Sequence, residues 1–216
     1  MATWLRSYPR TSYALVVAHS HRHHEHVAGR AQFEGRPGTT VVGKDRLSVM
    51  KFFAFTNCPG EVLRLDLGGR VQQITGTAGH HVSSISILDG WSGFLLPGDV
   101  LYPGRLCIQD MAAFAYRLDP IHGLAASGRV RHVMGAHVEM SRTARRDYPP
   151  GATYQRDEPS LQISIEQLRG LRVGALSTAN CPGAHVLDEF AIFNGPRRPA
   201  IVHQRARGLR GTLCRS

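Results

Sequence analysis

The chain has 216 residues, of which 42% are hydrophobic and 19% are charged. This is the composition of an ordinary globular domain and argues against a disordered chain. No run of about 18 apolar residues occurs, so the sequence predicts no transmembrane helix, and the first ten residues lack the apolar core of a secretory signal. We therefore expect a cytoplasmic protein without a membrane partner.

The formal net charge of +10 points at first to nucleic acid. Six arginines and no acidic residue lie between Arg197 and Ser216, so much of the excess belongs to the end of the chain. We expect one domain over residues 1–195 and a basic, disordered tail over 196–216. A small-molecule substrate is accordingly favoured, nucleic acid stays the less favoured partner, and the oligomeric state is not predicted.

The pattern of apolar residues predicts strands alternating with helices. In chain order we expect a strand over 13–18, a helix over 25–33, a strand over 39–42, a helix over 44–55, and strands over 62–67, 71–75, 84–88 and 93–96. A helix over 108–118, a short helical piece near Leu124, a strand over 131–134, a surface loop over 141–159, a helix over 161–175 and a strand over 185–193 complete the order. This alternation predicts a layered fold of the α/β (α+β) class.

Histidine is the informative residue, since five of the 12 histidines lie within positions 19–26. The strand over 13–18 runs into the cluster His21-Arg22-His23-His24-Glu25-His26. Imidazole nitrogens and carboxylate oxygens both bind zinc, and a chain leaving a sheet can direct several side chains toward one point. Taken alone, the cluster also fits a histidine-rich tract that scavenges metal or is solvated.

Three later positions repeat the theme at the ends of predicted strands. His80 follows Gly79, Asp99 follows Gly98, and His137 comes two residues after a glycine. Glycine allows the tight turns that bring a backbone close to an ion. Ligands from several strand ends are a common way to build a rigid metal site.

The order H-x-H-x-[D/E]-H, Gly-His, Gly-Asp and Gly-x-His resembles the metallo-β-lactamase superfamily, with a ligand pattern similar to that of glyoxalase II-type thioesterases. Segments 16–29, 76–87, 95–104 and 134–140 carry the resemblance, which extends over about 13–194. It implies an αββα sandwich. Because only 20 residues precede the cluster, we expect the N-terminal strands of that sandwich to be missing or incomplete.

The resemblance also implies a two-metal site. In it His21, His23 and His80 hold the first metal, Glu25, His26 and His137 hold the second, and Asp99 bridges the two. Zinc is the expected metal, with iron or manganese as alternatives. The implied function is a metal-dependent hydrolase in which metal-activated water attacks a small ester, thioester, lactone or amide, with Asp99 and Glu25 as the catalytic carboxylates.

Several features leave alternatives open. The superfamily usually has Asp where this chain has Glu25, and His24 replaces a small or polar residue, so the second metal site is in question. Glu139 is interpreted either as a group that orients His137 or as part of a surface salt bridge. The alternative functions are a phosphodiesterase or nuclease of the same fold, suggested by the basic charge, and a truncated, non-catalytic homologue.

Overall fold

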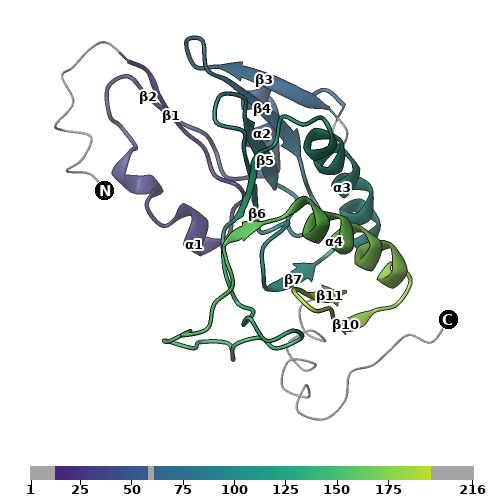
Figure 1. Cartoon of the computed structure of the whole chain (residues 1–216). Helices are drawn as coiled ribbons and strands as arrows, with labels where there is room; N and C mark the ends of the chain where they lie inside the picture. Colours follow the sequence, from purple (N-terminus) through teal and green to yellow (C-terminus); the bar gives the residue numbers. More distant parts are fainter. Residues whose placement is uncertain (1–12, 58–60, 196–216) are drawn as a thin grey trace.

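The computed structural model describes residues 13–57 and 61–195, and the predicted tail lies outside this part of the chain. A six-stranded sheet with the order β3-β4-β5-β6-β8-β9 forms its centre (Figure 1). The strands are β3 (Val62–Asp66), β4 (Val71–Gly76), β5 (Ile85–Asp89), β6 (Phe94–Gly98), β8 (His132–Gly135) and β9 (Gln162–Ile163). The neighbours are antiparallel except for β6 and β8, which are parallel.

The first hairpin of the sheet follows the prediction. Val62 pairs with Thr75 and Asp66 pairs with Val71 across the β3–β4 ladder. The turn between the strands contains Gly68 and the residue after it, both with positive φ, a conformation that glycine adopts without steric cost.

The long helices begin at residues that cap their free N–H groups. Asp45 accepts a hydrogen bond from Ser48 N at the start of α2 (Arg46–Phe53), and Asp110 caps α3 (Met111–Ala126). Helix α4 (Ile165–Thr178) begins with a capping box formed with its preceding serine. Such caps satisfy donors that the helix itself leaves unpaired.

Apolar side chains cover both faces of the central sheet. On one face, Leu88 and Leu95 pack in a large core with buried side chains of α3 and α4, such as Phe114 and Leu171. These two helices pack against each other on one side of the sheet (Figure 1). On the other face, Ile74 belongs to a smaller cluster that includes side chains of α2. Packing on both faces holds the sheet rigid, and with it the residues that follow the ends of its strands.

Two smaller sheets complete the fold. Strands β7 (Arg105–Ile108), β11 (Ala191–Asn194) and β10 (Gly183–Val186) form one of them. Strand β1 (Leu15–Val17) pairs in parallel with β2 (Thr39–Val41) in the other. Figure 1 shows this β1–β2 pair reaching away from the central sheet on the side that carries α1.

Some predicted elements differ from the observed ones. The strand β7 was not predicted, the region 161–175 begins with β9 before α4, and 185–193 is a hairpin of two strands where one was expected. The predicted helix over 25–33 consists of α1 (His24–Val27) and a short 3-10 helix, Arg30–Gln32.

Helix α3 also departs from the prediction, since it continues past Pro120 to Ala126 although a break was expected after residue 118. Proline removes one helical hydrogen bond. The side chains of Ile121 and Leu124, which are buried in the large core, compensate for that loss. The layered α+β class is nevertheless as predicted, and no helix among the described residues is long and apolar enough to cross a membrane.

Candidate metal centre

The predicted histidine cluster lies where the chain leaves β1 and meets the end of the central sheet. Ser20 ties this point to the sheet, because its carbonyl oxygen accepts a hydrogen bond from Ile85 N at 2.8 Å. His21 follows and is only 2% exposed. His23 is the N-terminal cap residue of α1, and His26 lies within that short helix. The loop and α1 therefore supply several imidazoles to one place.

Glycines turn the chain immediately before two other predicted ligands. Gly79 has φ +142, and a Cβ there would lie 2.8 Å from the backbone of α3. Gly98 has φ +58, and a Cβ there would lie 2.8 Å from Ser20 Cβ. His80 and Asp99 follow these glycines and are both 6% exposed. A side chain at either position would collide with a neighbouring element, so both turns require glycine.

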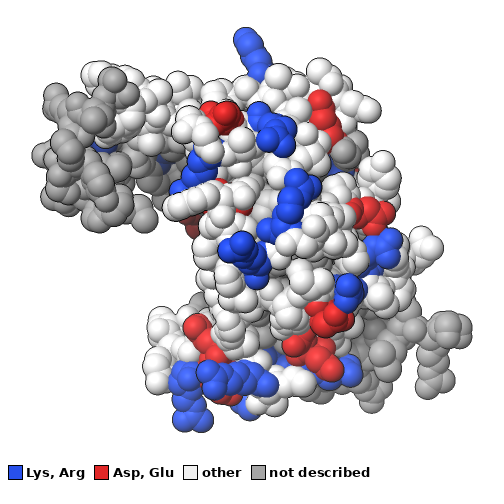
Figure 2. All heavy atoms as spheres, turned by 45° about the horizontal axis from the view of Figure 1, so that its top comes forward, with Lys and Arg blue, Asp and Glu red and all other residues white. Residues whose placement is uncertain are grey.

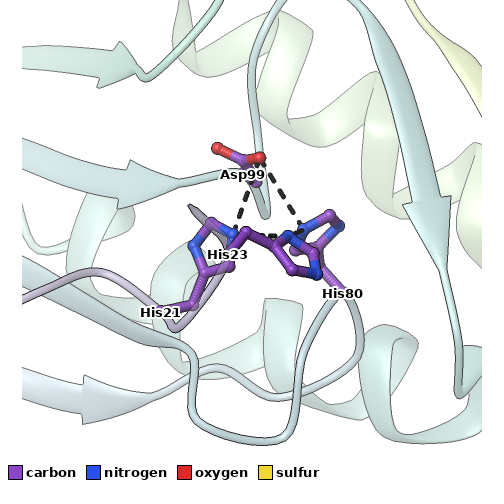
Figure 3. Close-up of side chains that lie close together, drawn as sticks. All are labelled: His21, His23, His80 and Asp99. Carbon is purple, nitrogen blue, oxygen red and sulfur yellow. Dashed lines mark hydrogen bonds and ion pairs between the residues drawn. The ribbon is translucent and has the colours of Figure 1, made fainter. Parts of the chain in front are cut away.

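The three imidazoles of the predicted first metal site face one another and the carboxylate (Figure 3). His23 Nδ1 lies 2.8 Å from His21 Nε2 and 3.0 Å from His80 Nε2. Asp99 Oδ2 lies 3.8 Å from His21 Nε2 and 3.7 Å from His80 Nε2. One ligand atom from each of these four residues lies within 4.8 Å of all the others.

This geometry fits a zinc ion. Ligand atoms at about 2.0–2.1 Å from a tetrahedral ion lie about 3.3 Å from one another, close to the separations observed. Imidazole nitrogens that converge with their lone pairs need a proton or a cation between them. Three imidazoles and one carboxylate also form a donor set that zinc accepts. The cluster can therefore hold a metal ion.

The other oxygen of Asp99 faces a second set of ligands. Its Oδ1 lies 3.2 Å from His26 Nε2 and 3.3 Å from His137 Nε2, and these two nitrogens are 3.3 Å apart. Glu25 Oε1 lies 3.9 Å from His26 Nε2, and His21, Glu25, His26 and Asp99 form a second group whose ligand atoms lie within 4.8 Å. Each carboxylate oxygen of Asp99 therefore points to a different set of imidazoles.

Neighbouring groups orient three of the histidine rings through the ring nitrogens that face away from the centre. His80 Nδ1 lies 2.9 Å from Cys107 O. Because a carbonyl oxygen only accepts, Nδ1 carries the proton and the lone pair of Nε2 faces the centre. Ser20 Oγ lies 3.2 Å from the Nδ1 atoms of both His21 and His26. These contacts hold the ring orientations without occupying the nitrogens that converge.

Burial and charge affect the two sides of the centre differently. Burial lowers the pKa of His21 to about 3, so its ring is neutral at physiological pH and available as a ligand. The hydrogen bond to Asp99 raises the pKa of His137 above its ordinary value. Burial alone would raise the pKa of Asp99, but its contacts with His137 and His26 hold that pKa below its usual range.

Three further residues lie beside the cluster of histidines and Asp99. The Glu25 side chain is 57% exposed at the edge of the centre, and His24 is exposed and belongs to neither ligand group. The His81 ring lies 5.1 Å from that of His23, and its Nδ1 accepts a hydrogen bond from Ser83 N.

The orienting groups Ser20 and Cys107 were not predicted from the sequence. Nothing in a sequence marks a backbone carbonyl as the partner of His80, because that contact joins residues 27 positions apart. The serine directly before the cluster was the only available signal.

The comparisons with known proteins agree with this picture at the level of the fold. No protein-family model and no curated protein matches the chain. Among solved structures, it is similar to a metallo-β-lactamase from Pontibacter korlensis, with a TM-score of 0.51 and 12% identity over 81% of this chain and 74% of that chain. The protein TMB-1 matches with a TM-score of 0.51 and 13% identity over 83% and 74% of the two chains. The chain thus has the metallo-β-lactamase fold, as the order of its ligands predicted.

Proposed function

We propose that this protein is a metal-dependent hydrolase with a two-metal, zinc-preferring centre that acts on a small ester, thioester, lactone or amide. The observation that carries the proposal is the position of Asp99. Its two oxygens face two different sets of imidazoles, as a carboxylate shared between two ions would.

In this proposal the ligands fall into a buried set and an accessible set. The buried set is His21, His23 and His80, of which His23 is partly exposed. The accessible set is Glu25, His26 and His137, of which His26 is the least exposed, and Asp99 joins the two. The side chains of Glu25 and His137 are 57% and 37% exposed, so the centre opens toward solvent on their side, and a substrate would enter there.

Bound ions would supply Lewis acidity, which polarises a substrate carbonyl and lowers the pKa of water. The residues of the chain prepare the site for this chemistry. Burial keeps the His21 ring neutral, and the Cys107 carbonyl fixes the tautomer of His80. The rigid strand ends hold the ligands in place, so that little reorganisation is needed when ions bind.

The test combines elemental analysis with hydrolysis of an ester, a thioester, a lactone, an amide and a phosphodiester. We expect two equivalents of zinc in the purified protein, and loss of both zinc and hydrolysis in His23→Ala. His24→Ala is the matched control, because it removes an exposed imidazole next to the site and should change neither. Less than one equivalent of metal, or hydrolysis that His23→Ala leaves intact, would contradict the proposal.

The surface favours a small substrate over nucleic acid. On the face in Figure 2, basic side chains are spread over the surface, and several lie beside acidic ones. Ion pairs such as Arg169–Glu166 and Arg172–Asp119 illustrate this mixing. Nucleic-acid binding usually requires a continuous basic patch. Turnover of the phosphodiester alone would favour the same-fold phosphodiesterase, and two bound metals without any turnover would favour the non-catalytic alternative.

A further inference from the structure

Arg105, at the start of β7, is a buried guanidinium with partners in a later part of the chain. The residue is 8% exposed. Its Nη2 donates to Glu139 Oε1 at 2.7 Å, and its Nη1 donates to Tyr148 O at 2.6 Å and to Asp147 Oδ2 at 3.2 Å. The partners lie 34 to 43 positions further along the chain. We call Arg105, Glu139 and Asp147 the Arg105 clamp.

Burying the charges of the Arg105 clamp costs free energy, so we look for a structural role that justifies it. Removing charges from water is expensive, and a buried ion pair often stabilises a protein no more than apolar residues would. What a guanidinium does supply is a planar fork of donors that holds several acceptors in fixed directions. Here these acceptors belong to the turn after β8 and to the loop over 141–159.

His137 lies in the turn after β8, and Arg105 contacts this turn at Glu139, two residues later. Glu139 Oε2 accepts a hydrogen bond from Arg105 N at 2.8 Å, and Glu139 N donates to Pro103 O at 2.7 Å. Tyr102 donates to Arg105 O at 2.7 Å, and its ring lies 5.3 Å from that of His137. The segment 102–105 therefore holds the His137 turn through both backbone and side-chain contacts.

No comparable clamp is needed by the buried ligands. His80 is held by the Cys107 carbonyl, and Asp99 follows directly from β6 of the central sheet. His137 instead leads into a loop that is long and mostly exposed. Without a fixed turn, its ring would lose orientation before those of the other ligands.

We propose that Arg105 is a positioning residue that orients His137 and the loop over 141–159, and thereby sets the affinity of the second metal while leaving the first unaffected. This inference rests on the two-metal centre proposed above. Two roles for Glu139 were left open by the sequence. The present proposal favours the role in which Glu139 orients His137, which it does through Arg105 and not by direct contact.

The experiment measures zinc binding to the metal-free protein by competition with a chelator, and resolves the first and second equivalents. In Arg105→Met we expect the second equivalent to bind about 10- to 100-fold more weakly, the range typical of groups that orient metal ligands. Glu139→Gln, which keeps the size of the side chain and is the milder change, should weaken it in the same direction. Cobalt spectra of both variants should show a changed second site and an unchanged first site.

Arg172→Met is the control, because it removes an ion pair with Asp119 that joins α3 to α4 and should leave both equivalents unchanged. If Arg105→Met does not fold, Glu139→Gln decides. The proposal is refuted if the second equivalent binds normally in the variants that fold. It is also refuted if binding of both equivalents weakens by the same factor, which is what a purely structural role predicts. A wild-type protein that binds no second equivalent refutes the two-metal function and the clamp together.

Discussion

Two buried aspartates lie at opposite ends of β6, and their surroundings are chemically different. Asp89, the last residue of β5 before the turn into β6, accepts hydrogen bonds from Arg70, Gln72 and Ser92. Asp99, directly after the strand, is surrounded by imidazole nitrogens at 3.2 to 3.8 Å. The two residues are 4% and 6% exposed, so burial does not distinguish them.

In the proposed function, this difference separates a structural carboxylate from a metal ligand. Asp89 has a permanent cation and neutral donors, which hold its pKa below the usual range, so its charge is satisfied by the protein. Asp99 is surrounded by imidazoles that are themselves metal ligands in the proposed function, where bound cations would balance its charge. Two contrasts can be tested: Asp89 against Asp99, and the buried against the accessible set of proposed ligands.

The largest effect is expected from Asp99→Asn, which keeps the size of the side chain and removes the charge. We expect at most one equivalent of zinc and a fall in kcat/KM of about 1,000-fold, since the electrostatic contribution of the ions amounts to several kcal/mol. Elemental analysis and kinetics on the substrate identified by the panel check this, and full activity with one equivalent would remove the bridging role.

The next effect distinguishes the buried ligands from the accessible ones. His80→Ala removes a ligand held by a backbone carbonyl and should abolish binding of the first metal. Glu25→Ala removes a largely exposed carboxylate and should weaken only the second metal, by at least about 10-fold, because groups that merely orient ligands already contribute that much. Titration with zinc measures both, and equal losses in the two variants would show that the contrast is wrong.

A smaller effect, on stability alone, is expected from Asp89→Asn. The change weakens the bonds from Arg70, Gln72 and Ser92, and we expect Tm to fall by about 2–4 °C, as for the loss of one modest interaction in a chain of this size. The zinc content should remain at the wild-type value. A loss of zinc in this variant would mean that the two aspartates are not functionally separate.

The smallest effect concerns pH. Because the folded pKa of Asp89 lies below its ordinary value, its contribution to stability is present above the unfolded pKa of about 3.9 and is lost as the pH falls toward the folded pKa. The difference in unfolding free energy between wild type and Asp89→Asn should therefore be constant from pH 7 to about 5 and shrink below about 4. Denaturant unfolding at each pH measures it, and a difference that grows in acid would contradict the assignment.

The sequence predicted which side chains come together better than it predicted the elements around them. The histidine cluster, His80 and Asp99 were found because they follow apolar runs and glycines, both of which are local signals. The strand β7 was missed because it has only four residues and pairs with β11, more than 80 positions later. Its stability depends on that distant partner, which local periodicity does not report.

The same limit applies to the groups that support the site. Arg105 has no local mark, since its partners Glu139 and Asp147 become neighbours only through the fold. The break predicted after residue 118 is wrong for a related reason: α3 continues through Pro120, and packing of the helix against the core maintains it.

The projecting β1–β2 pair would give a bound metal a second role. His21 and His23 follow β1, whereas His80 and Asp99 belong to the end of the central sheet. An ion shared among them would fasten the projecting strands to the body of the protein. Metal supply would then govern the lifetime of the polypeptide as well as its activity, since a chain depleted of zinc would leave this region open to proteases.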